Sequence, residues 1–310
     1  MTKDISQWKA RDDKAFLSLL VPTALCVFGV FLSLQPNMFL YSTGQLLLSF
    51  FFLQTFILLH ECGHLNFFKT RFLNTFFGHV LGLLTVIPFY SWTHMHNLHH
   101  KWTGWRDKDP TTEKTVEPQD SPIMRWVVNV SWFLFIPLFF LSYMVSNYWN
   151  VMKIKRHLNA QKFRMTILHM VAYVAIYFLL GLFFNAFLIH FVLPAFLLSL
   201  IWKELVIMTQ HSHIDIPISN GAEVKPVPYA DQVTYTRSFY VNAWFEALFL
   251  FNFNHHELHH VYPGIPAYYL QKIDINLPKE PSYIHWFVQA KSMKGEDYVF
   301  RTSAKTGKKF

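Results

Sequence analysis

Long apolar runs divide the chain into segments that match the thickness of a lipid bilayer. A helix needs roughly 20 consecutive, mostly apolar residues to span the hydrocarbon core. Four runs meet this length, and they lie near 15–35, 38–59, 165–184 and 186–209. The pattern therefore predicts an all-α integral membrane protein with four transmembrane helices.

Three other apolar stretches are expected to lie at the membrane without crossing it. The stretches 76–90 and 241–251 are below spanning length, so we expect buried or interfacial helices there. The run 126–147 is longer, but Arg125 precedes it and Lys153 follows it. Since short basic loops stay on the cytoplasmic side, this run has both flanks inside, and we expect it to lie along or dip into the membrane.

Basic residues at the ends of the apolar runs predict the orientation of the chain. The segment before the first run and the segment 148–164 are both rich in Lys and Arg, whereas the turns 33–37 and 183–187 are uncharged. The positive-inside rule then places the uncharged turns outside, so the four spans form two helical hairpins. The same rule predicts a multi-pass protein whose histidine-rich polar segments form a cap on the cytoplasmic side.

The composition supports a single membrane domain. Of the 310 residues 52% are hydrophobic and only 15% are charged, and no Gly/Ser-rich or Pro-rich linker divides residues 1–310. The net charge of +8 comes from the loop residues that set the orientation, so we expect no nucleic-acid partner. The two cysteines, Cys26 and Cys62, predict no disulfide framework. The first apolar run has no small-residue cleavage signature, which predicts a retained span.

Histidine is concentrated in three short patterns, "HECGH" from His60, "HNLHH" from His96 and "HELHH" from His256. Residues at i, i+3 and i+4 share one side of a helix, so each pattern directs two or three imidazoles the same way. By composition, His-x-x-His-His should occur about 0.05 times in such a chain, yet it occurs twice. Because neutral imidazole is the commonest metal ligand, the patterns predict a metal site. Its candidate ligands are His60, His64, His96, His99, His100, His256, His259 and His260.

Eight imidazoles exceed the coordination shell of one metal ion, which favours two ions. Iron suits redox chemistry with dioxygen on an apolar substrate, whereas zinc does not. "HECGH" alone also fits the zinc-protease pattern, with Glu61 as the base, but the other two patterns have no role in such an enzyme. A metal-binding or transport protein is a further alternative, although transporters usually show internal repeats and charged groups at mid-membrane.

The three patterns, in this order and on this topology, resemble the histidine boxes of the membrane fatty acid desaturase superfamily. The resemblance runs from His60 to Leu270, and "HECGHLNFFKTRFL" and "HHVYPGIPAYYL" look most like acyl-lipid desaturases of the omega-6/delta-12 and omega-3 types. It implies two non-haem iron ions, dioxygen as co-substrate, and a small electron-donor protein, either a ferredoxin or a haem protein with its reductase. The implied reaction introduces a cis double bond into a lipid acyl chain. A hydroxylase or ketolase of an acyl chain, alkane or carotenoid has the same boxes and is the alternative.

The resemblance also implies roles for single residues. It makes the eight histidines iron ligands and adds a ninth after the last span, either His211 or His213, with His211 preferred because it follows a glutamine. Glu61 and Glu257 are placed to accept the second N–H of a ligand ring. The carboxylates at positions 107 and 109 are equally compatible with solvated loop charges. The other histidines are expected to be neighbours or structural residues: His79, His94, His157, His169, His190, His255 and His285.

Two features bear on substrate and partners. The aromatic segments 76–92 and 244–253 either line an acyl-chain tunnel or face lipid and neighbouring helices. Lys101, Arg106 and the basic stretch "KTGKKF" either dock anionic headgroups or an acidic donor protein, or form a solvated positive surface.

Overall fold

The computed structural model describes residues 7–116, 121–273 and 281–310. Within these ranges the chain forms helices and no strand, and a single bridge joins Tyr240 to Ser282. The all-α prediction is therefore confirmed.

The first two long apolar runs form a helical hairpin. The helices α1 (Asp12–Ser18) and α2 (Leu20–Ser33) lead into α3 (Met38–Gly63). The side chain of Asn37 begins α3 by accepting the N–H of Phe39 at 2.9 Å, which satisfies a donor that the helix itself cannot. Apart from Thr23 and Ser33, α2 consists of apolar residues, as expected of a helix in contact with lipid.

The third and fourth predicted spans belong to one long helical stretch. The helix α9 (Ala160–Phe187) continues through the π-helical turn η3 (Leu188–Val192) into α10 (Leu193–His211). At 52 residues, the stretch is more than twice the length that one crossing requires. Its backbone leaves helical geometry at Phe184, inside the predicted turn 183–187, and α10 then packs along α3.

Two further helix pairs are sharply bent. The helices α4 (Arg71–Thr85) and α5 (Phe89–Trp102) meet at 98°. The helix α6 (Pro122–Phe133) meets the stretch Leu138–Trp149, which comprises α7 (Leu138–Met144) and η2 (Val145–Trp149), at 112°. Such a bend occurs in a broken span or a re-entrant segment. The described residues thus contain three helical stretches that are long and apolar enough to cross a membrane, or up to five if each bent pair counts as one span.

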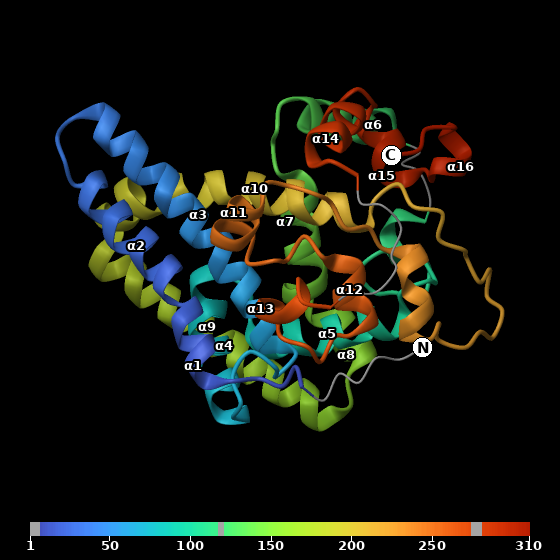
Figure 1. The fold of residues 1–310 in the computed structure, drawn as a ribbon, viewed down its shortest axis with the longest axis horizontal. Coiled ribbons are helices and arrows are strands. Elements are labelled where there is room, and N and C mark those ends of the chain that lie inside the picture. The colour runs from blue at the N-terminus through green and yellow to red at the C-terminus, as the bar shows by residue number, and fades with distance from the viewer. Residues whose placement is uncertain (1–6, 117–120, 274–280) are drawn as a thin grey trace.

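The remaining elements are short, and most lie toward the end of the molecule opposite the turn between α2 and α3, whereas α11 (Ala243–Phe245) lies beside α3 (Figure 1). The other short elements are η1 (Glu113–Thr115), α8 (Val151–His157), η4 (Tyr229–Tyr235), η5 (Glu246–Leu250), α12 (His256–Val261), α13 (Ala267–Leu270), α14 (Tyr283–Lys291), α15 (Gly295–Phe300) and α16 (Ser303–Thr306). The predicted helix at 241–251 is divided between α11 and η5.

An aromatic core brings the histidine-bearing elements together. Phe56, fully buried on α3, has its ring centroid 5.6 Å from Trp92 on α5, 5.4 Å from Phe140 on α7 and 6.3 Å from Phe253 just before α12. The ring of Phe253 in turn lies 4.8 Å from that of His60. Burial of these large rings stabilises the approach of four segments that are far apart in the sequence.

Candidate metal centre

Nine of the predicted histidines meet in two adjacent groups. In each group, one ring nitrogen per residue lies within 4.8 Å of all the others. The groups adjoin, because the ring centroids of His100 and His260, one from each group, are 4.2 Å apart. The first group consists of His60, His64, His96, His100 and His259, and the second of His99, His211, His256 and His260.

Helical spacing explains how the second and third patterns serve both groups. Residues four apart on a helix are offset by about 40° around its axis, and residues three apart by about 60° in the opposite direction. On α5, His96 and His100 accordingly join the first group while His99 joins the second. On α12 the assignment is reversed, because His256 and His260 join the second group and His259 joins the first.

The spacing of the ring nitrogens fits a shared metal ion. The Nε2 of His96 lies 3.0 Å from that of His64 and 3.1 Å from that of His100. Two nitrogens that bind one ion from about 2.1 Å at right angles are about 3.0 Å apart. In the second group, the Nε2 atoms of His256 and His260 are 3.1 Å apart. Among the described residues, the buried Nε2 of His60 has no hydrogen-bond partner, which leaves its lone pair free for an ion.

Burial keeps those histidine rings of the two groups that lie outside the apolar spans in their neutral form. It lowers the pKa of His64 from 6.5 to about 3. Burial, together with the neighbouring histidines, also holds the pKa values of His256, His259 and His260 well below the usual range. Since only neutral imidazole binds a metal, these rings are ready as ligands at pH 7 without losing a proton.

Glu61 has the supporting contact that the sequence predicted. Its carboxylate lies 3.0 Å from the Nδ1 of His60 through one oxygen, and its other oxygen accepts the backbone N–H of Ala267 at 2.8 Å. Both His60 and Glu61 are buried. The contact fixes the orientation of the His60 ring and directs its Nε2 into the first group.

Asp109 has the supporting role that the sequence left open beside that of a solvated loop charge. Its carboxylate lies 2.7 Å from the Nδ1 of His99 and also accepts the hydroxyl of Thr111 at 2.9 Å. Asp109 is only 3% exposed, so it is not a solvated loop charge. Asp107, two residues earlier, instead accepts the backbone N–H of Ser219 and holds a loop.

Gln232 is a supporting residue that sequence reasoning missed. Its side-chain oxygen lies 3.0 Å from the Nδ1 of His260, and its amide donates to the backbone carbonyl of His100 at 2.8 Å. Gln232 is fully buried on η4 and therefore contacts both histidine-bearing helices. Nothing in the local sequence signals this contact, because it joins residues 28 and 132 positions apart.

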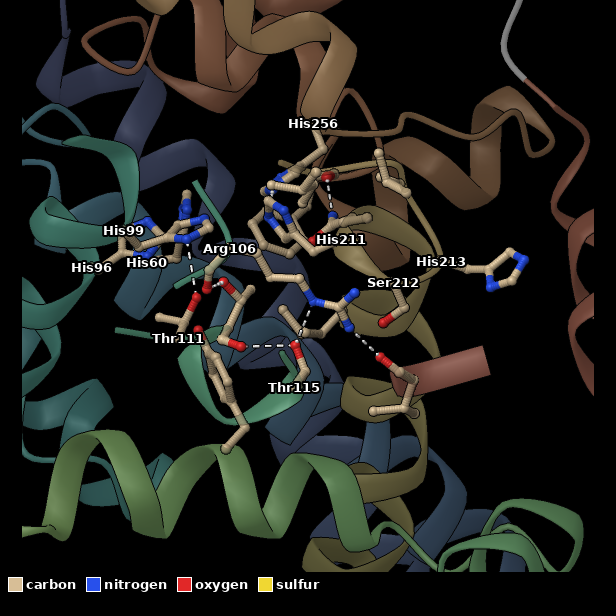
Figure 2. A pocket seen from close by; sticks show the side chains of 18 of the residues that line it. His60, His96, His99, Arg106, Thr111, Thr115, His211, Ser212, His213 and His256 are labelled. Atoms are coloured by element: carbon tan, nitrogen blue, oxygen red, sulfur yellow. Dashed lines mark hydrogen bonds between the residues drawn. The ribbon is translucent and has the colours of Figure 1, made fainter. Parts of the chain in front are cut away.

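The structure separates the two candidates for the ninth histidine. The Nε2 of His211 lies 2.6 Å from that of His256, inside the second group. The ring of His213 points away from the other labelled histidines (Figure 2). Its Nδ1 lies 2.9 Å from the carbonyl of Arg301, and its Nε2 lies 2.8 Å from the hydroxyl of Thr306.

Other predicted residues lie around the two groups. Glu257 donates its backbone N–H to Ser238 and lines a separate hollow beside Arg237, so its support of a ligand ring stays a prediction. His255 contacts Glu246 and belongs to neither group. His79 stacks on His169 with ring centroids 4.9 Å apart, also outside both groups.

A small cavity of about 100 Å³ adjoins the two groups (Figure 2). Rings of His60 and His96 line it from the first group, and His99, His211 and His256 line it from the second. The wall also includes hydroxyl-bearing side chains and one guanidinium, among them Thr111, Thr115, Tyr143 and Arg106.

The expected surface role of Arg106 is wrong. Arg106 is 8% exposed, and its guanidinium donates to the hydroxyl of Thr115 at 3.1 Å and to the carbonyl of Val299 at 2.9 Å. The loop after α5 folds inward at this point, since Arg106 also donates its backbone N–H to Pro217. Arg106 therefore holds the cavity wall and is not available to a docking partner.

Comparison with known proteins decides the family. Residues 36–289 match the family model described as fatty acid desaturase. The chain belongs to the fatty acid desaturase family. This family match includes every histidine of both groups. The match extends over most of the chain, and the family predicted from the sequence is therefore confirmed.

Three relatives of this desaturase chain show how far the similarity extends. A "Fatty acid desaturase" of Bacillus subtilis (strain 168) is 30% identical over 36% of this chain and 33% of its own length. An "sn-1 oleoyl-lipid 12-desaturase" of Picosynechococcus sp. (strain ATCC 27264 / PCC 7002 / PR-6) is 26% identical over 80% of this chain and 70% of its own. An "sn-1 acyl-lipid omega-3 desaturase (ferredoxin)" of Nostoc sp. (strain 36) is 36% identical over 22% of this chain and 20% of its own length. The match to the Bacillus relative thus spans about a third of that protein.

Proposed function

We propose that the protein is an oxygen-dependent acyl-lipid desaturase that introduces a cis double bond into a lipid acyl chain. The observation that carries this proposal is the meeting of nine histidines in two adjoining groups. Membership of the fatty acid desaturase family and the names of the acyl-lipid relatives support the substrate class.

The nine histidines would hold two iron ions, one in each group. Imidazole is a suitable ligand for iron. The four histidines whose pKa values are lowered by burial are neutral at pH 7, as metal ligands must be. When bound, iron supplies the activation of dioxygen that an unactivated C–H bond requires. The chain's own residues orient the rings, through Glu61, Asp109 and Gln232, and exclude bulk water by burial.

Desaturation of a single bond with one molecule of dioxygen requires two electrons and two protons from outside, and it releases two molecules of water. A small electron-donor protein must therefore dock near the histidine groups. The Nostoc relative carries "ferredoxin" in its name, which supports a ferredoxin as the donor. A haem protein with its reductase is the alternative donor.

We further propose a four-span topology for the single domain, with the histidine groups on the cytoplasmic side. The hairpin of α2 and α3 and the break near Phe184 between α9 and α10 support four crossings. The bends of 98° and 112° fit segments that enter the membrane and return to the same side. All nine histidines lie at or beyond the same ends of α3 and α10, so this topology leaves them on one face of the bilayer.

Expression in a host with a simple fatty-acid profile tests the function. We expect new unsaturated chains that are two mass units lighter than their precursors, with the double bond located by fragmentation. The His259→Ala variant, which removes a member of the first group, should give no product while still inserting in the membrane. A product that has only gained oxygen would replace the desaturase proposal with a hydroxylase.

A further inference from the structure

A second polar hollow lies on the opposite side of α5 from the histidine groups. It has a volume of about 370 Å³ and is bounded by α5, the end of α8 and the start of α9. The polar side chains that line it are His94, Asn97, Lys101, His157, Asn159 and Lys162. On α5, the residues 94, 97 and 101 are centred about 140° around the helix axis from the residues 96, 99 and 100. The hollow is therefore separate from the candidate metal centre.

The lining of this hollow is cationic. Lys101 comes from α5 and Lys162 from the first turn of α9, and none of the described residues that line the hollow is acidic. The nearby carboxylate of Glu113 is already paired, with Lys153 at 2.8 Å and with Arg156 at 2.9 Å. The two lysines thus face the hollow without a counter-charge from its walls.

The start of α9 adds hydrogen-bond donors to the same hollow. Its first turn is capped by Asn159, whose side chain accepts the N–H of Lys162 at 2.9 Å. The first N–H groups of a helix have no partner within it, and the helix dipole makes this end attractive to anions. The shielded Nε2 of His157, on the hollow's wall, has no hydrogen-bond partner among the described residues.

The hollow lies where the chain begins its longest apolar stretch. The segment Ala160–His211 is apolar enough to span a membrane, and Lys162 and Arg164 are its first charged residues. Basic residues at the ends of spans lie at the level of the lipid headgroups, where they attract anionic lipids. This depth favours a ligand that is itself anchored in the bilayer.

We propose that this hollow binds the phosphate group of an anionic membrane phospholipid. Lys101 and Lys162 would hold the phosphate from two sides, and the start of α9 would donate backbone N–H groups to it. Because Lys101 lies on α5, a bound headgroup would anchor the helix that carries His96, His99 and His100. The site requires association with a membrane but not iron, so its failure would leave the proposed desaturase intact.

Lipid retention by the full-length protein tests the proposal. The protein would be purified from bilayers that contain equal amounts of phosphatidylglycerol and phosphatidylcholine, and the bound lipids counted by native mass spectrometry. We expect a preference for phosphatidylglycerol that falls about tenfold in the double variant Lys101→Gln/Lys162→Gln. The pair Lys225→Gln/Lys294→Gln removes the same charge from exposed positions elsewhere and should keep the preference. The charge-conserving pair Lys101→Arg/Lys162→Arg should keep it too.

Four outcomes would overturn the proposal. An unchanged preference in Lys101→Gln/Lys162→Gln would show that the hollow holds no lipid. An equal loss in Lys225→Gln/Lys294→Gln would show that the total surface charge, and not a site, selects the lipid. If inorganic phosphate at millimolar concentration bound with the same dependence on Lys101 and Lys162, the ligand would be a soluble phosphate. Loss of coupling to an acidic donor protein, with lipid preference unchanged, would assign the hollow to protein docking.

Discussion

Three ring nitrogens of the candidate metal centre point outward to three different partners. The Nδ1 of His60 meets Glu61, that of His99 meets Asp109, and that of His260 meets the side-chain oxygen of Gln232. Each partner presents an oxygen, which favours the tautomer that carries its proton on Nδ1 and presents its Nε2 to the group. Residues outside the histidine patterns therefore determine how the candidate ligands are oriented.

Replacement of Asp109 by asparagine tests this orientation at one residue. Asp109→Asn keeps the size of the side chain but replaces a charged acceptor 2.7 Å from His99. Loss of such a partner typically weakens metal affinity by about 10–100-fold. We expect iron to dissociate faster from this variant, as measured by competition with a chelator. Asp107→Asn, whose carboxylate holds Ser219, is the matched control, and equal iron affinity in both variants would contradict the assignment.

The ninth ligand can be identified by a pair of alanine variants. His211→Ala removes a ring whose Nε2 lies 2.6 Å from that of His256, so we expect the iron content to fall by about one ion per chain. His213→Ala removes a ring that bonds Arg301 and Thr306, and we expect its iron content to stay unchanged. Elemental analysis of both purified variants distinguishes them. The reverse pattern would make His213 the ligand.

The sequence predicts the ligands better than it predicts their supporting residues. The boxes are local patterns, because residues at i, i+3 and i+4 meet in any helix. Glu61 was also foreseeable, since it neighbours His60 in the chain. Asp109 reaches His99 only because the chain turns back after α5, and Gln232 reaches His260 from another element. Both contacts depend on the tertiary fold. The sequence therefore left the role of Asp109 open, and no local pattern indicated Gln232.

At the scale of elements, α2 and α3 pack so closely that a side chain has no room at Gly44. A Cβ at this position would lie 2.5 Å from the backbone nitrogen of Ser33 and 2.6 Å from the carbonyl oxygen of Gly29. Both are backbone atoms, so the clash can be relieved only by moving one helix. The hairpin therefore depends on a glycine, as close helix pairs in membranes often do.

The substitution Gly44→Ala should accordingly destabilise the protein by about 1–3 kcal/mol. Gly181→Ala on α9 is the control, because a Cβ there would meet nothing within 4 Å and alanine favours a helix by about 1 kcal/mol over glycine. Thermal unfolding in detergent should show a lower midpoint for the first variant and an equal or higher one for the second. Equal stability of Gly44→Ala and the parent chain would mean that the hairpin is looser than described.

Helix boundaries show where hydropathy stops being informative. The runs 15–35 and 38–59 predicted the hairpin of α2 and α3 well, because an uncharged turn separates them. The runs at 165–184 and 186–209 predicted two separate spans. In the structure, α9 continues through the π-helical turn η3 into α10, and the chain bends there without a loop. Apolar composition fixes how much chain the membrane can hold, but backbone geometry at residues such as Phe184 decides where it turns.

At the scale of the whole molecule, the buried histidines should make the iron-free protein sensitive to acid. In the folded state the pKa of His64 is lowered to about 3, and those of His256, His259 and His260 are also lowered. The unfolded chain, with ordinary pKa values near 6.5, therefore binds protons first as the pH falls. The contribution of these histidines to stability should be constant above pH 7 and fall below about 6.5, by about 1.4 kcal/mol per pH unit for each histidine.

Thermal unfolding of the iron-free protein between pH 8 and pH 5 measures this effect. We expect the midpoint to fall between pH 6.5 and pH 5, and the fall to be shallower in His64→Gln, which cannot take up that proton. Iron bound to the rings should delay the fall, since protons and metal compete for the same nitrogens. A midpoint that is flat from pH 8 to pH 5 would contradict the burial of neutral rings.

The iron content of the purified protein is the most direct test of the central claim, that the two histidine groups form two neighbouring iron sites. The protein would be loaded with ferrous iron without oxygen, freed of unbound metal and measured for iron and protein by elemental and amino-acid analysis. Two tightly bound irons per chain are expected, with about one lost in His211→Ala. One iron or none in the intact chain would contradict the account.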